Sequence, residues 1–91
     1  MTKPDILQIG PYPDWDQHPL DAAFTMHRYF EASEKSDFLA KVGPKIRGIA
    51  TRGELGANAA IINACPGLEV ISVYGVGFDA VDLALCRERG I

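Results

Sequence analysis

The chain has 91 residues, of which 47% are hydrophobic and 23% charged, and a formal net charge of −3; this is the composition of one small globular domain. It holds no cluster of Lys and Arg that could neutralise a phosphate backbone, so a nucleic-acid partner is not expected. No segment has the apolar core of a secretory signal or the roughly 18 apolar residues of a membrane span, so we expect a cytoplasmic protein with no membrane partner.

Strand and helix patterns alternate in the first half of the chain. In chain order, they predict a strand over 5–9, a loop over 10–19, a helix over 20–24, a strand over 25–30 and a helix over 33–43. The loop is expected because three prolines and a glycine in GPYPDWDQHP disfavour both helix and sheet. Ser33 is a candidate cap for the last of these helices, which Gly43 and Pro44 would end.

The second half continues the alternation. It predicts a strand over 45–51, a helix within 54–65, a strand over 68–75 and a helix that ends at Gly90. The run LEVISVYG gives the strongest strand pattern, and either Asp79 or Asp82 could cap the helix that follows it. Ile91 would begin another strand, so the pattern stops part-way and the sheet is expected to be truncated.

Strands that alternate with short helices imply right-handed crossovers and a parallel sheet with helices on both faces. We therefore predict an α/β fold with a doubly wound parallel sheet and one domain over residues 1–91. Cys65 and Cys86 are the only cysteines. Both lie in helix-like segments without metal or redox spacing, so we expect two buried thiols and no metal site.

The stretch from Gly75 to Ala80, GVGFDA, matches the G-x-G-x-x-G/A pattern of a dinucleotide-binding loop. Such a loop needs a helix that opens inside the glycine pattern and an acidic residue about 20 positions further on. Only 91 − 77 = 14 residues follow Gly77, and an acid at Asp79 would repel phosphate at a helix N-terminus. We therefore assign no cofactor-binding residue in this chain. A simple turn, followed by a capped helix, also accounts for the glycines.

A third interpretation is a small-anion site at the carboxyl ends of two neighbouring strands. The loops TRGELG and GVGFD each leave a predicted strand at that edge, where open α/β sheets bind ligands. Glycines at Gly53, Gly75 and Gly77 let main-chain N–H groups approach a carboxylate or phosphate closely. Arg52 could add a fixed positive charge, although a single loop arginine is more often only solvated.

The segments IRGIATRGELGANAAIINACPGLEVIS and LEVISVYGVGFDAVDLALCRERGI resemble the D-isomer-specific 2-hydroxyacid dehydrogenases, and among these the glyoxylate and hydroxypyruvate reductases. The resemblance covers approximately the whole chain and is sharp over 46–91. It implies a flavodoxin-like substrate-binding domain, of which residues 1–91 are the N-terminal part, and a separate Rossmann domain, absent from this chain, that binds NADH or NADPH. The parent enzyme would reduce a small 2-keto acid, such as glyoxylate or hydroxypyruvate, and form a homodimer.

The resemblance also implies particular site residues. The main-chain amides of Val76 and Gly77 would hold the substrate carboxylate, and the loop with Arg52 and Gly53 would close over it. The catalytic Arg, Glu and His of the family would lie beyond Ile91. The chain would therefore hold no catalytic residue and be inactive alone.

Neither His18 nor His27 is expected to serve as the acid/base, because the sequence places no Asp or Glu beside either. Trp15 is expected to be half-buried by packing.

Two further functions remain possible from the residues alone. One is a stand-alone flavodoxin-like module that binds a small anion, and the other is a small Rossmann-type nucleotide binder. A reading frame that continues past Ile91 with a strand, Pro-Gly and a long helix would favour the reductase, whereas a stop codon there would favour the module.

Overall fold

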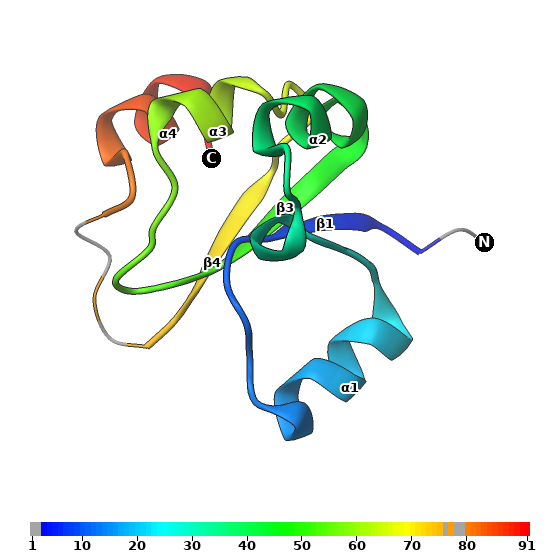
Figure 1. The fold of residues 1–91 in the computed structure, drawn as a ribbon. Coiled ribbons are helices and arrows are strands. Elements are labelled where there is room, and N and C mark those ends of the chain that lie inside the picture. The colour runs from blue at the N-terminus through cyan, green and yellow to red at the C-terminus, as the bar shows by residue number, and fades with distance from the viewer. Residues whose placement is uncertain (1–2, 76, 78–79) are drawn as a thin grey trace.

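A computed structural model describes residues 3–75, 77 and 80–91, which form a four-stranded sheet flanked by helices (Figure 1). The strands are β1 (Asp5–Gln8), β2 (Thr25–Arg28), β3 (Ile46–Arg52) and β4 (Val70–Tyr74). The helices are α1 (Asp14–Ala23), α2 (Lys35–Val42), α3 (Ala59–Asn63) and α4 (Leu83–Arg89), and two 3₁₀ turns lie at Tyr29–Glu31 and Gly43–Lys45. Each predicted strand has a counterpart, within one or two residues at its ends.

All pairs of neighbouring strands are parallel, and their order is β2-β1-β3-β4. The chain moves from β1 outward to β2, and then crosses back to add β3 and β4 on the other side. Helix α1 lies on one face of the sheet, and α2, α3 and α4 lie on the opposite face (Figure 1). This confirms the predicted doubly wound α/β fold. The direction in which the chain adds strands to the sheet reverses between β1 and β3. In open α/β sheets, ligands bind in the crevice at the carboxyl ends of the two strands where this reversal occurs.

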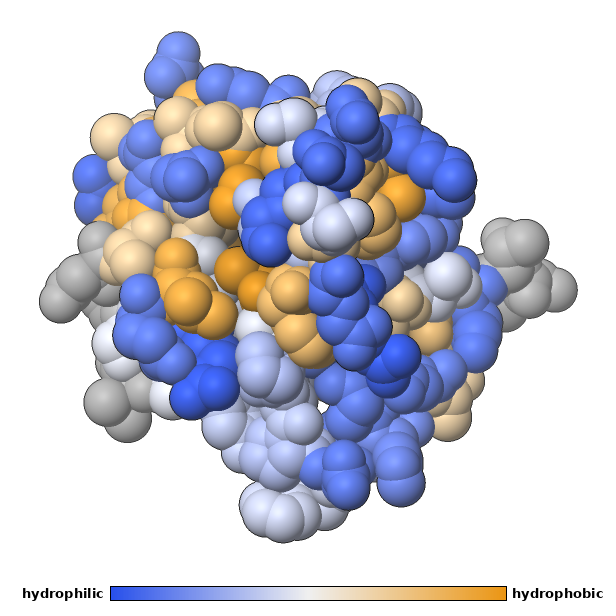
Figure 2. Space-filling model, in the orientation of Figure 1, coloured by the Kyte–Doolittle hydropathy of each residue, from blue (hydrophilic) through white to orange (hydrophobic). Residues whose placement is uncertain are grey.

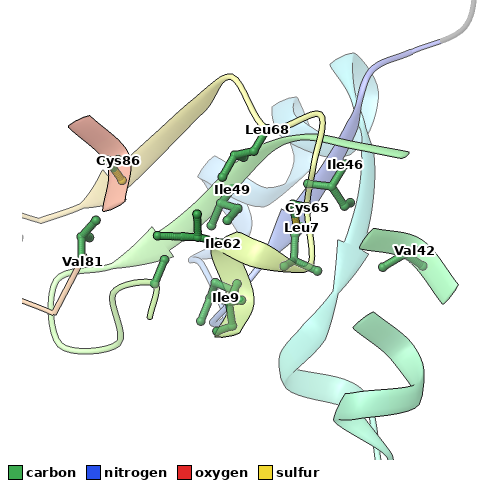
Figure 3. Packing of buried hydrophobic residues seen from close by; sticks show 12 residues of the cluster. Leu7, Ile9, Val42, Ile46, Ile49, Ile62, Cys65, Leu68, Val81 and Cys86 are labelled. Carbon is green, nitrogen blue, oxygen red and sulfur yellow. The ribbon is translucent and has the colours of Figure 1, made fainter. Parts of the chain in front are cut away.

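The main core lies between the sheet and the three helices on that opposite face (Figure 3). Its buried members are Leu7, Ile9, Val42, Ile46, Ile49, Ala57, Ile61, Ile62, Cys65, Leu68, Val81 and Cys86. Each fully buried Leu or Ile contributes roughly 1.5–3 kcal/mol relative to exposure. Both thiols are free and buried, as predicted, and burial raises the pKa of the Cys65 thiol.

The surface differs between these two layers. Figure 2 shows one side of the molecule. Apolar residues are exposed between the helices in the upper part of this view, whereas the surface in the lower part, where α1 lies, is hydrophilic to neutral.

The loop predicted over 10–19 is wrong, because α1 begins at Asp14 and contains Pro19. Asp14 and Asp16 in the first turn complement the helix dipole. The buried amides of Gln8 and Gln17 then bond to each other in both directions, at 2.7 and 2.9 Å, and fix the helix to β1. Pro19 removes one main-chain hydrogen bond inside the helix. The contact between Gln8 and Gln17 therefore outweighs the tendency of the prolines to prevent a helix.

The N-terminus of α2 also differs from the expectation. The helix starts at Lys35 with Glu34 at the cap position, and no side chain caps it, so the assignment of Ser33 is wrong. The helix ends at Val42 before Gly43, as expected. A Cβ on Gly43 would lie 2.1 Å from the Ala64 carbonyl oxygen, so this glycine also allows close packing against the end of α3.

The last helix follows the prediction at its cap and at its end. The Asp82 carboxylate accepts from the main-chain N–H of Leu85 at 3.1 Å and caps α4, while the alternative cap, Asp79, lies outside the described residues. Gly90 ends the helix with φ of 73°. Ile91 is in no strand, and its N–H donates to the Cys86 carbonyl at 2.8 Å.

Candidate functional site

Three loops meet at the carboxyl edge of the sheet, after β1, β3 and β4. They do so because these strands are parallel neighbours, so their carboxyl ends lie at one edge. At the start of the second loop, the N–H of Gly53 donates to the Tyr74 carbonyl at 3.3 Å. The loops after β3 and β4 therefore lie side by side, as predicted.

Main-chain hydrogen bonds clamp these two loops together further along. The N–H of Ala57 donates to the Ala80 carbonyl at 3.2 Å, and the N–H of Asp82 donates to the Ala57 carbonyl at 3.0 Å. Gly56 has φ of 59°, and a Cβ there would lie 2.1 Å from the Ala80 oxygen. Only glycine permits this contact. Gly56 was not among the predicted site residues, and its one signal in the sequence is its place at the end of the loop TRGELG.

The glycines assigned to substrate binding differ in their surroundings. A Cβ on Gly53 would lie 3.1 Å from the Gly77 oxygen, so the two assigned loops are in contact at these residues. A Cβ on Gly77 would meet no described atom within 4 Å, which leaves room for a ligand. Gly75 has φ of 120°, a conformation that favours glycine. Val76, the other assigned residue, lies outside the described residues.

Arg52 ends β3 beside these loops, and its guanidinium is already engaged. Its Nε lies 2.8 Å from a carboxylate oxygen of Glu54, and its Nη1 donates to the Pro11 carbonyl at 3.5 Å. The Arg52 side chain is 40% exposed, and pairs this exposed contribute about 0–1 kcal/mol. A ligand carboxylate could therefore replace Glu54 at little cost. Glu54 was not predicted as this partner.

An aromatic cluster that the sequence analysis also missed borders the same edge. The rings of Tyr12 and Tyr74 lie 4.8 Å apart between centroids, tilted by 33°. The Tyr12 hydroxyl donates to the Thr51 carbonyl at 2.8 Å, and the Tyr74 hydroxyl donates to the Asp16 carboxylate at 2.8 Å. A hollow of about 300 Å³ lies beside them and is lined by Tyr12, Asp16, Pro19, Leu20 and Tyr74.

The ionisation of both phenols reflects these contacts. Burial raises the pKa of Tyr12, Tyr74 adds to the rise, and the nearby Arg52 guanidinium opposes it. The hydrogen bond to Asp16 is the main reason that the pKa of Tyr74 is raised. Both hydroxyls therefore keep their protons at neutral pH and donate them within the protein.

The remaining candidates lie elsewhere or differ from expectation. His18 is exposed on α1. His27 does have an acidic neighbour, because its Nε2 lies 2.8 Å from the Asp5 carboxylate, which corrects the expectation. The pair joins β1 to the outer strand β2, on the far side of the sheet from β4. Trp15 is 76% exposed in the first turn of α1, so the expected half-buried packing is wrong.

The start of α4 bears on the dinucleotide motif. A dinucleotide loop offers free N–H groups of a helix that begins within the glycine pattern. Here α4 begins at Leu83, and 83 − 77 = 6 positions separate it from Gly77. Its first turn already bonds the Asp82 carboxylate. The described residues thus do not fit a pyrophosphate-binding loop.

The described residues offer neither a metal site nor a membrane-spanning helix. Within residues 3–75, 77 and 80–91, no three His, Cys, Asp or Glu side chains gather in a way that could hold a metal ion. None of the helices described in that part of the chain is long and apolar enough to cross a bilayer.

Known proteins that resemble this chain in sequence and fold are dehydrogenases and reductases. A solved 2-hydroxyacid dehydrogenase from Ketogulonicigenium vulgare is 74% identical, with a TM-score of 0.98 over 100% of this chain and 29% of its own. The 2-ketogluconate reductase of Gluconobacter oxydans is 42% identical over 99% of this chain and 28% of its own length. The NADPH-dependent glyoxylate/hydroxypyruvate reductase of Sinorhizobium meliloti, solved with citrate, is 26% identical, with a TM-score of 0.73 over 100% of this chain and 27% of its own.

The chain thus spans less than a third of the length of the relatives that it matches. Residues 7–91 match the family model described as D-isomer specific 2-hydroxyacid dehydrogenase, catalytic domain. The chain belongs to the D-isomer specific 2-hydroxyacid dehydrogenase family.

Proposed function

We propose that residues 1–91 form the N-terminal part of the substrate-binding domain of an NAD(P)H-dependent reductase that acts on a small 2-keto acid such as glyoxylate or hydroxypyruvate. Membership of the family supports this reaction class, as do the reductase activities by which the Gluconobacter and Sinorhizobium relatives are named. The observation that carries the proposal is the clamped pair of loops after β3 and β4, which leaves open space at Gly77.

The proposed roles follow from the chemistry of this edge. A 2-keto acid presents a carboxylate, which the main-chain N–H groups of Val76 and Gly77 would bind, and Gly77 has no side chain to block its approach. Arg52 would add charge by exchanging its exposed contact with Glu54 for the substrate. Gly53, which lies against Gly77, would let the preceding loop close over the ligand.

The cofactor is proposed to bind in a separate Rossmann domain outside the 91 residues. The late start of α4 and its cap at Asp82 support this division, because neither suits a pyrophosphate. We assign no catalytic residue to this chain, and propose that it has no reductase activity alone. The resemblance to the family leads us to propose a cytoplasmic homodimer for the whole enzyme.

A chimera tests the proposal. The matching 29% of the Ketogulonicigenium dehydrogenase is replaced by this chain, and oxidation of NADH and NADPH is followed with and without glyoxylate or hydroxypyruvate. We expect turnover that depends on the keto acid, and none from the 91 residues alone. A folded chimera that reduces no 2-keto acid would contradict the reductase, and would favour the alternative, a stand-alone module for small anions.

A further inference from the structure

The side chain of Arg52 lies between two segments of the carboxyl edge. One is its own turn, in which the N–H groups of Leu55 and Gly56 both donate to the Arg52 carbonyl, at 3.0 and 2.9 Å. The other is the loop after β1, where the Pro11 carbonyl accepts from Nη1 of Arg52 at 3.5 Å. A Cβ on Gly10 would lie 3.2 Å from Cδ of Arg52, so this glycine lets the loop lie against the arginine. The position of the guanidinium therefore depends on both segments.

Thr51, the residue before Arg52, is bonded to both of these segments. Thr51 is fully buried, and its hydroxyl donates to the Gly56 carbonyl at 2.7 Å, which joins the two ends of the turn. Its carbonyl accepts from the Tyr12 hydroxyl at 2.8 Å, and this bond joins the loop after β1 to β3. The main chain next to Arg52 is thus fixed from two directions.

Packing holds the Tyr12 hydroxyl at this bond. The Tyr12 ring lies 4.8 Å from the ring of Tyr74 between centroids, and Tyr74 is the β4 residue that pairs in register with Arg52. Aromatic pairs of this kind stabilise one orientation of the two rings. The phenol oxygen therefore stays directed at the Thr51 carbonyl.

These contacts matter because the arginine side chain is held only weakly by its own ion pair. Arg52 is 40% exposed, and its contact with Glu54 is one that a ligand carboxylate can replace at little cost. A long side chain that is free to move loses rotamer freedom when it binds a ligand, whereas one that is already placed loses less. Contacts that place Arg52 before the substrate arrives should therefore increase affinity for the substrate carboxylate.

We propose that Thr51 and Tyr12 are positioning residues of the site. The bond from Thr51 to Gly56 and the bond from Tyr12 to Thr51 together hold Arg52 where it meets the carboxylate of the 2-keto acid. This inference rests on the proposed reductase function, and it adds to the site two residues that act on the substrate through Arg52.

The test measures kcat and KM for glyoxylate in the chimera with the Ketogulonicigenium dehydrogenase. Thr51→Val removes the hydroxyl with little change in shape, and Tyr12→Phe removes the phenol oxygen and keeps the ring. We expect each to raise KM roughly three- to fivefold and to leave kcat within about twofold, because the carboxylate contact is made in both the ground state and the transition state. Thr51→Ser keeps the hydroxyl and should bring KM back to within about twofold of the unsubstituted chimera.

Two matched controls make the same chemical changes elsewhere in the chain. They are Thr25→Val, at the exposed first residue of β2, and Tyr29→Phe, at a tyrosine that packs against Phe38. Both should leave KM within about twofold. Melting curves establish which variants are folded. If Thr51→Val does not fold, Tyr12→Phe carries the test, because it leaves the buried hydroxyl of Thr51 in place.

A double-mutant cycle separates positioning from a general loss of stability. Thr51→Val and Tyr12→Phe are each combined with Arg52→Ala. If the two residues act through the arginine, each substitution should change KM by less than about twofold once the arginine is absent, because the effects of residues in one network do not add. A residue that only stabilises the fold would have the same effect in both backgrounds.

The outcomes separate this inference from the proposed function. If the chimera reduces glyoxylate but neither variant raises KM, or if KM rises equally with and without Arg52, the positioning inference is wrong while the reductase proposal stands. A fall in kcat with KM unchanged in both variants would also overturn it. If the folded, unsubstituted chimera reduces no 2-keto acid, both proposals fail.

Discussion

Replacing Gly56 with Ala is expected to destabilise the fold by separating the two loops of the site. Gly56 has φ of 59°, which costs a residue with a Cβ about 1–2 kcal/mol. The added Cβ would also lie 2.1 Å from the Ala80 oxygen, so the main chain must move. That movement breaks two hydrogen bonds, Ala57 to Ala80 and Asp82 to Ala57, of about 1 kcal/mol each. We expect a total loss of about 3–4 kcal/mol.

Two other glycines serve as controls in the same assay, urea unfolding followed by circular dichroism. Gly90 also has positive φ, 73°, but no described atom lies within 4 Å of its Cβ position, so Gly90→Ala should cost only about 1–2 kcal/mol. Gly67 has neither feature, its nearest contact being 3.6 Å, and Gly67→Ala should change the free energy of unfolding by less than about 1 kcal/mol. If Gly56→Ala lowers the free energy of unfolding no more than Gly90→Ala does, the proposed role of Gly56 in holding the two loops together is wrong.

Other predictions concern the chimera and the response to pH. Arg52→Ala should raise KM for the keto acid roughly tenfold and lower kcat less, because a carboxylate contact is made in both the ground state and the transition state. Glu54→Gln removes the carboxylate that pairs with Arg52, so it should lower KM. A fall in kcat alone would place Arg52 in the chemistry. Gly77→Val should weaken substrate binding and leave cofactor affinity, measured by fluorescence titration, nearly unchanged; the reverse would restore the dinucleotide interpretation. The pKa of Cys65 is raised in the fold by burial, and that of Tyr74 mainly by its hydrogen bond to Asp16. The contribution of each protonated group to stability is therefore complete below its ordinary pKa, 9.0 for Cys65 and 10.0 for Tyr74, and is lost as pH rises from there through the raised pKa of the folded state. The urea midpoint should therefore be lower at about pH 10.5 than at about pH 8, and an unchanged midpoint would contradict this.

The sequence was sufficient for the parallel sheet because its strands are short apolar runs separated by clear turn residues. LEVISVYG became β4 and KIRGIAT became β3, within about two residues at each end. Once both strands are assigned, the parallel crossover alone brings their loops to one edge. For this reason the adjacency of Gly53 and Gly77 could be predicted from sequence, whereas the exact contact between them could not.

The first helix was mispredicted because its stability comes from a distant residue. Pro19 lies inside the helix and disfavours it, and the opposing contribution is the buried bond between Gln17 and Gln8, nine positions earlier. Neither glutamine is distinctive in sequence. The wrong loop assignment also concealed the direction of Trp15, which the helix turns toward solvent.

The aromatic pocket was beyond local sequence reasoning for a related reason. Tyr74 and Asp16 are 58 positions apart, and their bond forms only when α1 is in place beside β4. Tyr12 lies in the first loop and joins them by packing on the Tyr74 ring. No periodicity or motif connects three such residues. Their proximity follows from the strand order together with the helix that the prolines concealed.

The central claim is that the carboxylate of a 2-keto acid binds at the loops after β3 and β4. The most direct test is a crystal structure of the chimera with oxamate, an unreactive analogue of a 2-keto acid. The account predicts that the oxamate carboxylate accepts from the main-chain N–H of Gly77 and lies against the guanidinium of Arg52, with the contact between Arg52 and Glu54 broken. Oxamate bound at any other edge of the sheet, with the ion pair of Arg52 and Glu54 intact, would contradict it.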